Sequence, residues 1–241
     1  MSYFFLILLA LLPSLIWLLF YLRKDSHPES NWMVLKIFFY GMLAAFPAVL
    51  IEMGIFEAFE RLSFPAFWIS ILNIFVGVAL IEELIKYLVV KEKALNDPEF
   101  DEPLDAMLYM IIAALGFAAL ENILVLLPYG PNLIVGKVLM ISGFRFIGAT
   151  FLHALASGLL GYFLALSLFE TKKRIKLLSV GLGISVLLHG LYNFYIIRLP
   201  EDIRLNDIRL IIPAILLIIL GFFVSQCFRK LKEMAGVCKV K

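Results

Sequence analysis

The sequence has few charged residues and few cysteines for its length. Of 241 residues, 17% are charged and 63% are hydrophobic, and the mean hydropathy is +0.98. A soluble domain of this size cannot bury so much apolar surface, which excludes a soluble globular protein. The two cysteines, Cys227 and Cys238, offer no paired framework, and we expect free thiols without a disulfide.

Several familiar signatures are also missing. The sequence contains neither the H-E-x-x-H pattern of zinc-protease helices, nor paired-cysteine zinc spacing, nor G-x-S-x-G. The net charge of +2 argues neither for nor against nucleic acid, but the basic residues cluster in loops, where they indicate orientation rather than a ligand. We expect no nucleic-acid partner. Internal repeats and low-complexity tracts are absent, and the loops are short. We therefore expect a single integral membrane domain, residues 1–241.

Long apolar runs are what the sequence has in abundance. Runs of about 20 residues, the length that crosses a bilayer, occur seven times. They lie near residues 3–22, 33–56, 65–90, 104–127, 144–169, 175–198 and 209–228. The first lacks a basic leader and a small-residue cleavage site, so it is interpreted as a retained span. The predicted fold is all-α, a polytopic membrane helix bundle of about seven transmembrane helices in a lipid bilayer.

The distribution of lysine and arginine predicts the orientation of this bundle. Loops one, three and five and the C-terminal end hold 14 of the 21 basic residues, and the opposite side holds 5. Lys86 and Arg145, the remaining two, fall within spans. Because cytoplasmic loops carry an excess of basic residues, the N-terminus is predicted outside and the C-terminus in the cytoplasm.

The third span carries an unusual group of ionisable residues, Glu82, Glu83 and Lys86. Such residues at hydrocarbon depth cost several kcal/mol unless they are paired. In a helix, Lys86 lies four residues after Glu82 and three after Glu83, so both acids can reach the amine. The group alone fits either a structural Glu–Lys pair or a functional site.

Three further spans place polar residues inside apolar helices. Span four contains Glu121 followed by Asn122, span five contains His153 with Ser157 four residues later, and span six contains His189 with Asn193 four residues later. Buried membrane carboxylates need partners, and these groups are the best partners for one another. We therefore predict one common, hydrated site between spans three and six, within residues 65–198.

The charge of this predicted site is unbalanced. Glu82, Glu83 and Glu121 face one lysine, Lys86, and the histidines are neutral at pH 7. Protons must then be shared, histidines protonated or a divalent cation bound. A carboxylate beside an imidazole can activate water as a general base, and the same residue types can bind zinc.

Two other features have simpler interpretations. Small residues line span five at Ala154, Ser157, Gly158 and Gly161, and Gly181 and Gly183 do so in span six, which predicts close helix packing. Glutamates near the outer end of span two are interpreted as a solvated or interfacial face. They are Glu52, Glu57 and Glu60.

Four motifs in order resemble those of the PrsW family of glutamic-type intramembrane proteases, which are distant relatives of the CAAX-prenyl-protease and bacteriocin-processing superfamily. The motifs are E-E-x-x-K at Glu82 to Lys86, F-x-x-x-E-N at Phe117 to Asn122, His153 followed by Ser157-Gly158, and H-x-x-x-N at His189 to Asn193. The similarity covers spans three to six, about half of the chain.

The resemblance implies an enzyme, an endopeptidase that hydrolyses peptide bonds of membrane-anchored proteins or peptides in a prokaryotic plasma membrane. Site-1 cleavage of an anti-sigma factor is the family's best-known role. By this resemblance, Glu82 would be the water-activating base, Glu83 its neighbouring acid and Lys86 the charge-balancing cation. His189 and Asn193 would be the oxyanion donors, and His153 would complete the wall of the polar cavity. Glu121 stands where the CAAX relatives have a histidine, which leaves open how the base and helper roles are distributed among these residues.

Other functions stay open at this stage. No cofactor is required by the glutamate mechanism, but a metal-dependent protease would use the same side chains as ligands of a divalent ion such as zinc. Those ligands would be Glu82, Glu83, Glu121, His153 and His189. Buried Glu and His residues also form proton relays, so a proton- or cation-coupled transporter is an alternative, as is a non-catalytic membrane scaffold.

Overall fold

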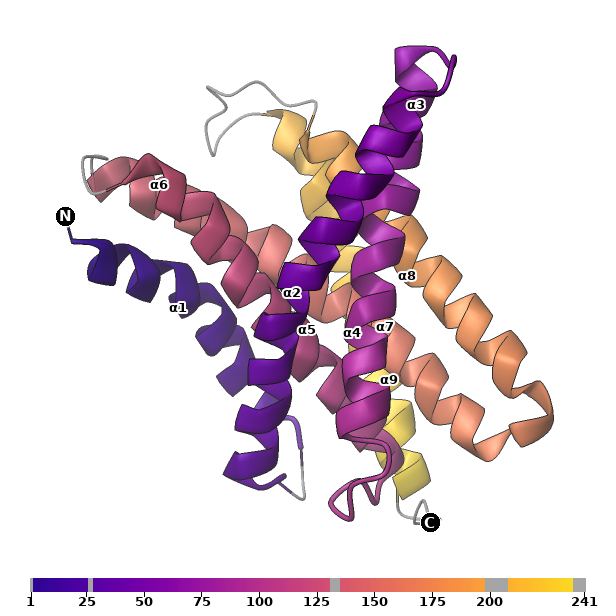
Figure 1. Ribbon diagram of the computed structural model, residues 1–241. Coiled ribbons are helices and arrows are strands. Elements are labelled where there is room, and N and C mark those ends of the chain that lie inside the picture. Colours follow the sequence, from indigo (N-terminus) through magenta and orange to yellow (C-terminus); the bar gives the residue numbers. More distant parts are fainter. Residues whose placement is uncertain (1, 26–27, 131–134, 198–207, 236–241) are drawn as a thin grey trace.

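The computed structural model of the protein describes residues 2–25, 28–130, 135–197 and 208–235, and all regular elements in this part of the chain are helices (Figure 1). Seven helical segments are long and apolar enough to cross a membrane, which confirms the predicted fold. The elements, in order, are α1 (Tyr3–Leu22), α2 (Asn31–Glu60), α3 (Ala66–Leu72), η1 (Asn73–Leu80), α4 (Ile81–Lys93), α5 (Pro103–Leu126), η2 (Leu127–Tyr129), α6 (Val135–Ile147), α7 (Ala149–Phe169), η3 (Thr171–Lys173), α8 (Arg174–Ile196), η4 (Ile208–Leu210) and α9 (Ile211–Ala235).

Two of the seven spans are composite. The third runs through α3, η1 and α4, and η1 is a π-helical stretch directly before Glu82. The fifth runs through α6 and α7, which are separated at Gly148. In the described residues the fifth span already includes residue 135, nine residues before the predicted start at residue 144, because α6 is amphipathic and does not form a continuous apolar run.

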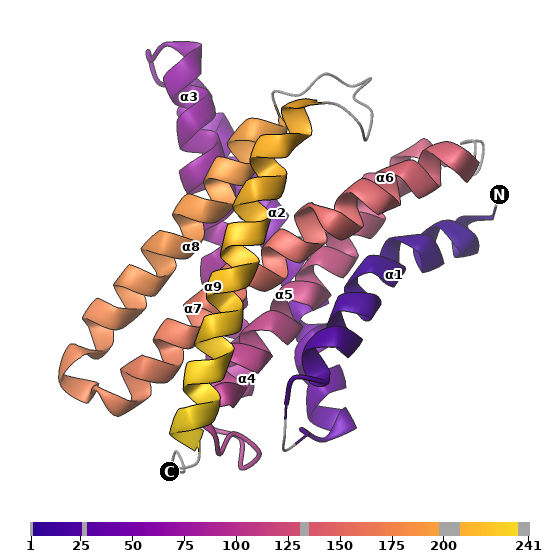
Figure 2. The ribbon, with the colours of Figure 1, turned by 180° about the vertical axis from the view of Figure 1, so that it is seen from behind.

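Helix α5 forms the centre of the bundle. Nearly every side chain from Pro103 to Leu120 is buried, and α1, α2, α4 and α7 pack around it (Figures 1 and 2). Glycines permit the closest approaches: Gly161 on α7 faces the backbone of Met107, and Gly116 on α5 faces that of Phe38. The predicted packing role of the small residues on span five is confirmed.

The glycines of α8 do not share one role. A side chain added at Gly181 would collide with Phe163 on α7, whereas one added at Gly183 would meet nothing within 4 Å. The predicted packing role is therefore correct for Gly181 and wrong for Gly183. The two residues lie two positions apart on a helix, so they face different directions.

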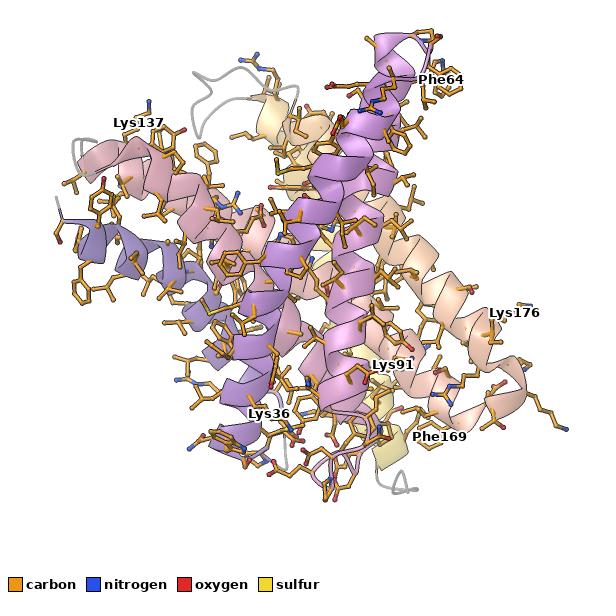
Figure 3. The ribbon with its side chains drawn as sticks, in the orientation of Figure 1. Lys36, Phe64, Lys91, Lys137, Phe169 and Lys176 are labelled. Carbon is orange, nitrogen blue, oxygen red and sulfur yellow. The ribbon has the colours of Figure 1, made fainter. Side chains whose placement is uncertain are left out.

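One end of the bundle is fastened by polar contacts between the loop after α4 and the start of α2. The Lys36 ammonium pairs with Asp97 at 2.8 Å, and the Ser30 hydroxyl donates to Glu99 at 2.8 Å. Lys36, Lys91 and Phe169 lie toward this end, and Phe64 and Lys137 lie toward the other (Figure 3). The spans therefore alternate in direction as the sequence predicts.

Of the two cysteines, Cys227 is a buried free thiol on α9, as expected. Cys238 lies outside the described residues. So do Arg198 and Arg204, two of the five basic residues counted on the opposite side.

Candidate active site

Helix α4 supplies both acids and the lysine of the E-E-x-x-K motif from one short segment. The preceding π-helical turns of η1 rotate the segment relative to a regular helix, and such turns occur frequently at functional sites. Glu82, Glu83 and Lys86 are all buried, with Glu83 and Lys86 completely inaccessible. The segment therefore presents its charged side chains to neighbouring helices and hides them from lipid.

Lys86 joins the two acids to the first histidine. Its ammonium donates to Glu82 Oε2 at 3.0 Å and to Glu83 Oε1 at 2.9 Å, and lies 2.8 Å from His153 Nδ1. It also lies 4.5 Å from the centre of the Phe117 ring, within range of a cation–π interaction. These contacts satisfy the buried cation from three helices, α4, α5 and α7.

Glu83 is the most fully bound acid of the cluster. Besides the Lys86 ammonium, its carboxylate accepts from the Ser157 hydroxyl at 2.6 Å and pairs with His189 Nδ1 at 3.0 Å. The second motif histidine is thus fastened to α4, and Ser157 serves as a donor to an acid.

Glu121 binds the other side of the first histidine. Its Oε2 lies 2.8 Å from His153 Nε2, and its Oε1 lies 2.9 Å from Arg145 Nη2. Arg145 Nε in turn donates to the Asn122 side-chain carbonyl. The two polar residues of span four therefore meet an arginine of α6 as well as a histidine of α7.

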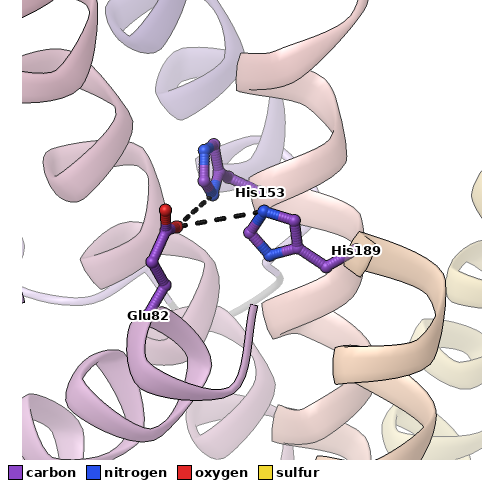
Figure 4. A group of neighbouring side chains, drawn as sticks. All are labelled: Glu82, His153 and His189. Carbon is purple, nitrogen blue, oxygen red and sulfur yellow. Dashed lines mark ion pairs between the residues drawn. The ribbon is translucent and has the colours of Figure 1, made fainter. Parts of the chain in front are cut away.

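The contacts fix the ring tautomers when the histidines are neutral. An ammonium only donates, so Nδ1 of His153 accepts from Lys86 and Nε2–H donates to Glu121. For His189, Nδ1–H donates to Glu83, which leaves the lone pair on Nε2. Both unprotonated nitrogens face Glu82 Oε2, His153 Nδ1 at 3.6 Å and His189 Nε2 at 3.9 Å (Figure 4).

This arrangement contains a possible metal-binding group. Glu82, His153 and His189 each offer one donor atom, and the three atoms lie within 4.8 Å of one another. Tetrahedral zinc with bonds of about 2.0–2.2 Å places its ligand atoms roughly 3.3–3.6 Å apart, close to the distances from Glu82. The other ring nitrogen of each histidine donates its N–H to a carboxylate, that of His153 to Glu121 and that of His189 to Glu83. Metal-bound histidines usually make such a hydrogen bond. The donor set therefore fits a metal ion.

Lys86 competes for the same lone pairs. Its ammonium binds two of the three donor atoms, Glu82 Oε2 and His153 Nδ1. A metal ion at this position requires the ammonium to move away, so the lysine and the metal are alternative cations for one place.

A cavity of about 390 Å³ adjoins the cluster. The polar residues of its lining are Glu121, Arg145, His153, His189, Tyr192 and Asn193. The apolar residues of its lining are Phe144, Ala149, Leu152, Ile196, Ile197 and Leu210. The structure thus places six of the seven predicted site residues in one network and Asn193 on the wall of the adjoining cavity.

Two charged groups near the site were not predicted to belong to it. Arg145 enters through its contacts with Glu121 and Asn122, and its position inside an apolar span was the signal that could have found it. Glu52 lies close enough to Glu82 and Glu121 to feel their charge, and its buried Oε1 has no hydrogen-bond partner among the described residues. The solvated-face interpretation is therefore wrong for Glu52, although Glu57 is exposed and paired with Arg61.

Comparison with known proteins gives a consistent result. Residues 29–224 match the family described as "PrsW family intramembrane metalloprotease". The protein named Protease PrsW from Geobacillus kaustophilus is 32% identical over 179 residues, which cover 74% of this chain and 73% of that protein. The Protease PrsW of Bacillus subtilis is 31% identical over 184 residues, 76% of this chain and 78% of that protein. No solved structure gives a significant match.

Proposed function

Because this chain belongs to the PrsW family and is an intramembrane protease, we propose that the cluster around Glu82 is its active site and hydrolyses peptide bonds of membrane-anchored proteins with an activated water molecule. The observation that carries the proposal is the network itself, in which acids and imidazoles from α4, α5, α7 and α8 converge beside a cavity. Placing any one of these ionisable side chains alone in a membrane would cost free energy. Together, paired acids and imidazoles are the groups that a hydrolase uses for general acid–base catalysis.

Glu82 is the proposed general base. In the described part of the chain Glu83 accepts three close contacts and Glu121 two, whereas Glu82 accepts one hydrogen bond, from Lys86. Its carboxylate therefore keeps the most freedom to take a proton from water. The base must lie within about 2.6–3.2 Å of the water it activates, and that water would reach Glu82 from the adjoining cavity beside His153 and His189.

His189 is the proposed proton carrier. Its unprotonated Nε2 faces Glu82 Oε2, so it can accept the proton that Glu82 removes from water and pass it to the leaving amine. The water oxygen forms a bond to the carbonyl carbon, the carbon–nitrogen bond then breaks, and the proton goes to the nitrogen. Asn193, on the cavity wall, is the proposed donor to the carbonyl oxygen.

Metal-dependent hydrolysis is a second candidate, favoured by a specific observation, the carboxylate-backed donor set of Glu82, His153 and His189. Charge favours it too, because Glu82, Glu83 and Glu121 against Lys86 and Arg145 leave one negative charge in excess, which a bound cation would balance. Such an ion, held by Glu82, His153 and His189, would polarise the substrate carbonyl and would supply hydroxide at neutral pH. In this case Glu82 is a ligand.

A screen with single-span membrane proteins tests the proposed activity. The wild type, reconstituted in lipid vesicles, should cut at least one member of the library, and fragments are identified by mass spectrometry. Glu82→Gln keeps the shape of the side chain and should abolish the cleavage. Glu57→Gln, an exposed glutamate on α2, is the matched control and should cleave normally. Full activity of Glu82→Gln would refute the assignment.

Metal analysis separates the two candidates. A metal-dependent enzyme should retain about one ion per chain on purification and lose activity with a chelator, and His189→Gln should lose the ion. A metal-free preparation with full activity would favour the glutamate mechanism. Neither the transporter nor the scaffold alternative is favoured by a specific observation in the structure.

The cellular arrangement is also proposed here. The cavity lies at the end of α8 that carries Asn193 and Ile197, opposite the basic end at Lys176. With the N-terminus outside and the C-terminus cytoplasmic, as positive charge predicts, the cavity serves the outer half of a prokaryotic plasma membrane. An anti-sigma factor with one span is the proposed substrate type. Cysteine placed at Lys137 should react with an impermeant maleimide on intact cells, and cysteine placed at Lys176 only after lysis.

A further inference from the structure

Arg145 is an intramembrane arginine that the proposed mechanism leaves without a task. It lies on α6, three residues before the break at Gly148, and its side chain is 16% exposed. A charged side chain at membrane depth is costly and is seldom present without a partner or a function. Arg145 also lines the cavity beside Glu121, His153, His189 and Asn193.

The guanidinium is held in one orientation by a chain of hydrogen bonds. Its Nε donates to the Asn122 side-chain carbonyl, and Asn122 Nδ2 donates to the Ala10 carbonyl at 3.2 Å and to the Thr150 hydroxyl at 3.1 Å. Its Nη2 lies 2.9 Å from Glu121 Oε1. Helices α1, α5, α6 and α7 therefore all contribute to its position. An ion pair with Glu121 would not by itself need this bracing.

Part of the donor capacity of Arg145 is unused. A guanidinium carries five N–H groups in a fixed fork. Nε is satisfied by Asn122 and Nη2 by its ion pair with Glu121, but Nη1 makes no hydrogen bond to any described residue. An acceptor on a substrate bound in the adjoining cavity would use this remaining donor group.

Arg145 is the charged donor in the cavity lining that remains available to a substrate. In the neutral tautomer set by Glu83, His189 Nε2 has no proton to donate, and Lys86 is occupied by two carboxylates and His153. Arginine stays charged at every accessible pH and binds oxygen atoms through its planar fork. A donor that is oriented before the substrate arrives, in a site of low dielectric, stabilises developing charge most effectively.

We infer that Arg145, together with Asn193, binds the carbonyl oxygen of the scissile peptide bond and stabilises the negative charge that forms on it. This inference rests on the proposed function. When water adds to the carbonyl carbon, the electron pair of the C=O double bond moves to the oxygen beside Arg145, and the water proton goes to Glu82. When the intermediate collapses, that electron pair re-forms the double bond and the amine leaves with the proton.

Kinetics on a single-span protein cleaved by the wild type test the inference. Arg145→Gln should lower kcat roughly 100-fold or more, the loss typical of an oxyanion donor, with a smaller change in KM. Arg145→Lys keeps the charge beside Glu121 but not the fork, and should stay well below wild type. Arg61→Gln is the matched control, because Arg61 forms an exposed ion pair with Glu57 on α2; its kinetics should be unchanged.

A double variant distinguishes a substrate contact from a mere counter-ion. If Arg145 touches the substrate, Arg145→Gln should cause a further loss of kcat in the Glu121→Gln background. Equal kcat values for Glu121→Gln and the double variant would overturn the inference, as would wild-type kcat in both single Arg145 variants. Those outcomes leave the proposed function intact, whereas a wild type that cleaves nothing removes both.

A binding measurement covers the case in which Glu121→Gln is inactive. The probe is a blocked Leu-Leu aldehyde, whose hydrate resembles the tetrahedral intermediate, compared with the corresponding alcohol. Wild type should be stabilised more by the aldehyde, as a larger rise in thermal unfolding temperature, and both folded variants, Arg145→Lys and Arg145→Gln, should lose this preference. An equal preference in the variants, or none in the wild type, would contradict the inference.

Discussion

Substituting one glycine at the close contact between α5 and α7 tests how tightly the bundle holds the site. A Cβ atom at Gly161 on α7 would lie 2.6 Å from Met107 Cα and 2.8 Å from the Ala106 carbonyl oxygen on α5. Favourable separations between carbon atoms are about 3.5–4.0 Å, so Gly161→Ala must push α5 and α7 apart by roughly 1 Å. Both contacts are backbone atoms, which cannot rotate away.

The expected loss can be sized from two opposing terms. Overpacking of this kind costs about 1–3 kcal/mol. Replacing glycine by alanine inside a helix returns up to about 1 kcal/mol through helix propensity. We therefore expect Gly161→Ala to lower the free energy of unfolding by roughly 1–2 kcal/mol. Gly183→Ala on α8 is the matched control, since nothing lies within 4 Å of its added Cβ, and it should be neutral or stabilising.

The same substitution should reduce activity. His153 on α7 binds Glu121 on α5 at 2.8 Å, and a hydrogen bond of this kind weakens beyond about 3.2 Å. Reversible unfolding in mixed detergent micelles, followed by circular dichroism, measures the stability, and cleavage of a single-span protein measures the activity. Equal unfolding free energies for Gly161→Ala and Gly183→Ala would refute the reasoning about the α5–α7 contact.

Three further outcomes follow from the structure. Burial raises the pKa of Glu29, outside the spans, from 4.5 to about 8, so the folded protein favours its protonated form. The contribution of Glu29 to stability should be full below about pH 4.5 and be lost as pH rises towards 8. Glu29→Gln should remove this part of the pH dependence in unfolding curves, and an unchanged pH dependence would count against it. Ser157→Ala removes a donor from buried Glu83 and should cost about 1–3 kcal/mol, whereas unaltered unfolding would show that the contact is dispensable. Lys86→Met removes the competing ammonium and should raise zinc retention by the purified protein, measured by elemental analysis; unchanged retention would mean that Lys86 and a metal do not share one place.

The bundle and its motif-bearing spans could be predicted from the sequence because bilayer thickness fixes the length of each apolar run. The convergence of Glu82, Glu121, His153 and His189 also followed, since intramembrane acids and imidazoles need partners. The exact pairing did not follow. Nothing in the spacing says that Glu83 binds one histidine and Glu121 the other, because these contacts depend on how α4, α5, α7 and α8 rotate against each other.

Two misses have physical causes. Arg145 carried a usable signal, a lone arginine in an apolar run, but its partners lie 23 and 24 residues earlier on another helix, beyond the reach of any local pattern. Glu52 was grouped with Glu57 by proximity in sequence, although five positions around a helix place the two side chains on different faces. The directions of the two side chains place Glu52 near the site and leave Glu57 exposed.

Isotope transfer from water tests the central claim most directly. The wild type and Glu82→Gln are each incubated with a single-span protein that the wild type cleaves, in water enriched in oxygen-18. The new C-terminus of the N-terminal fragment is then analysed by mass spectrometry. The account predicts one oxygen-18 atom in the new carboxyl group made by the wild type and no such fragment from Glu82→Gln. Labelled fragment from Glu82→Gln at the wild-type rate would contradict it.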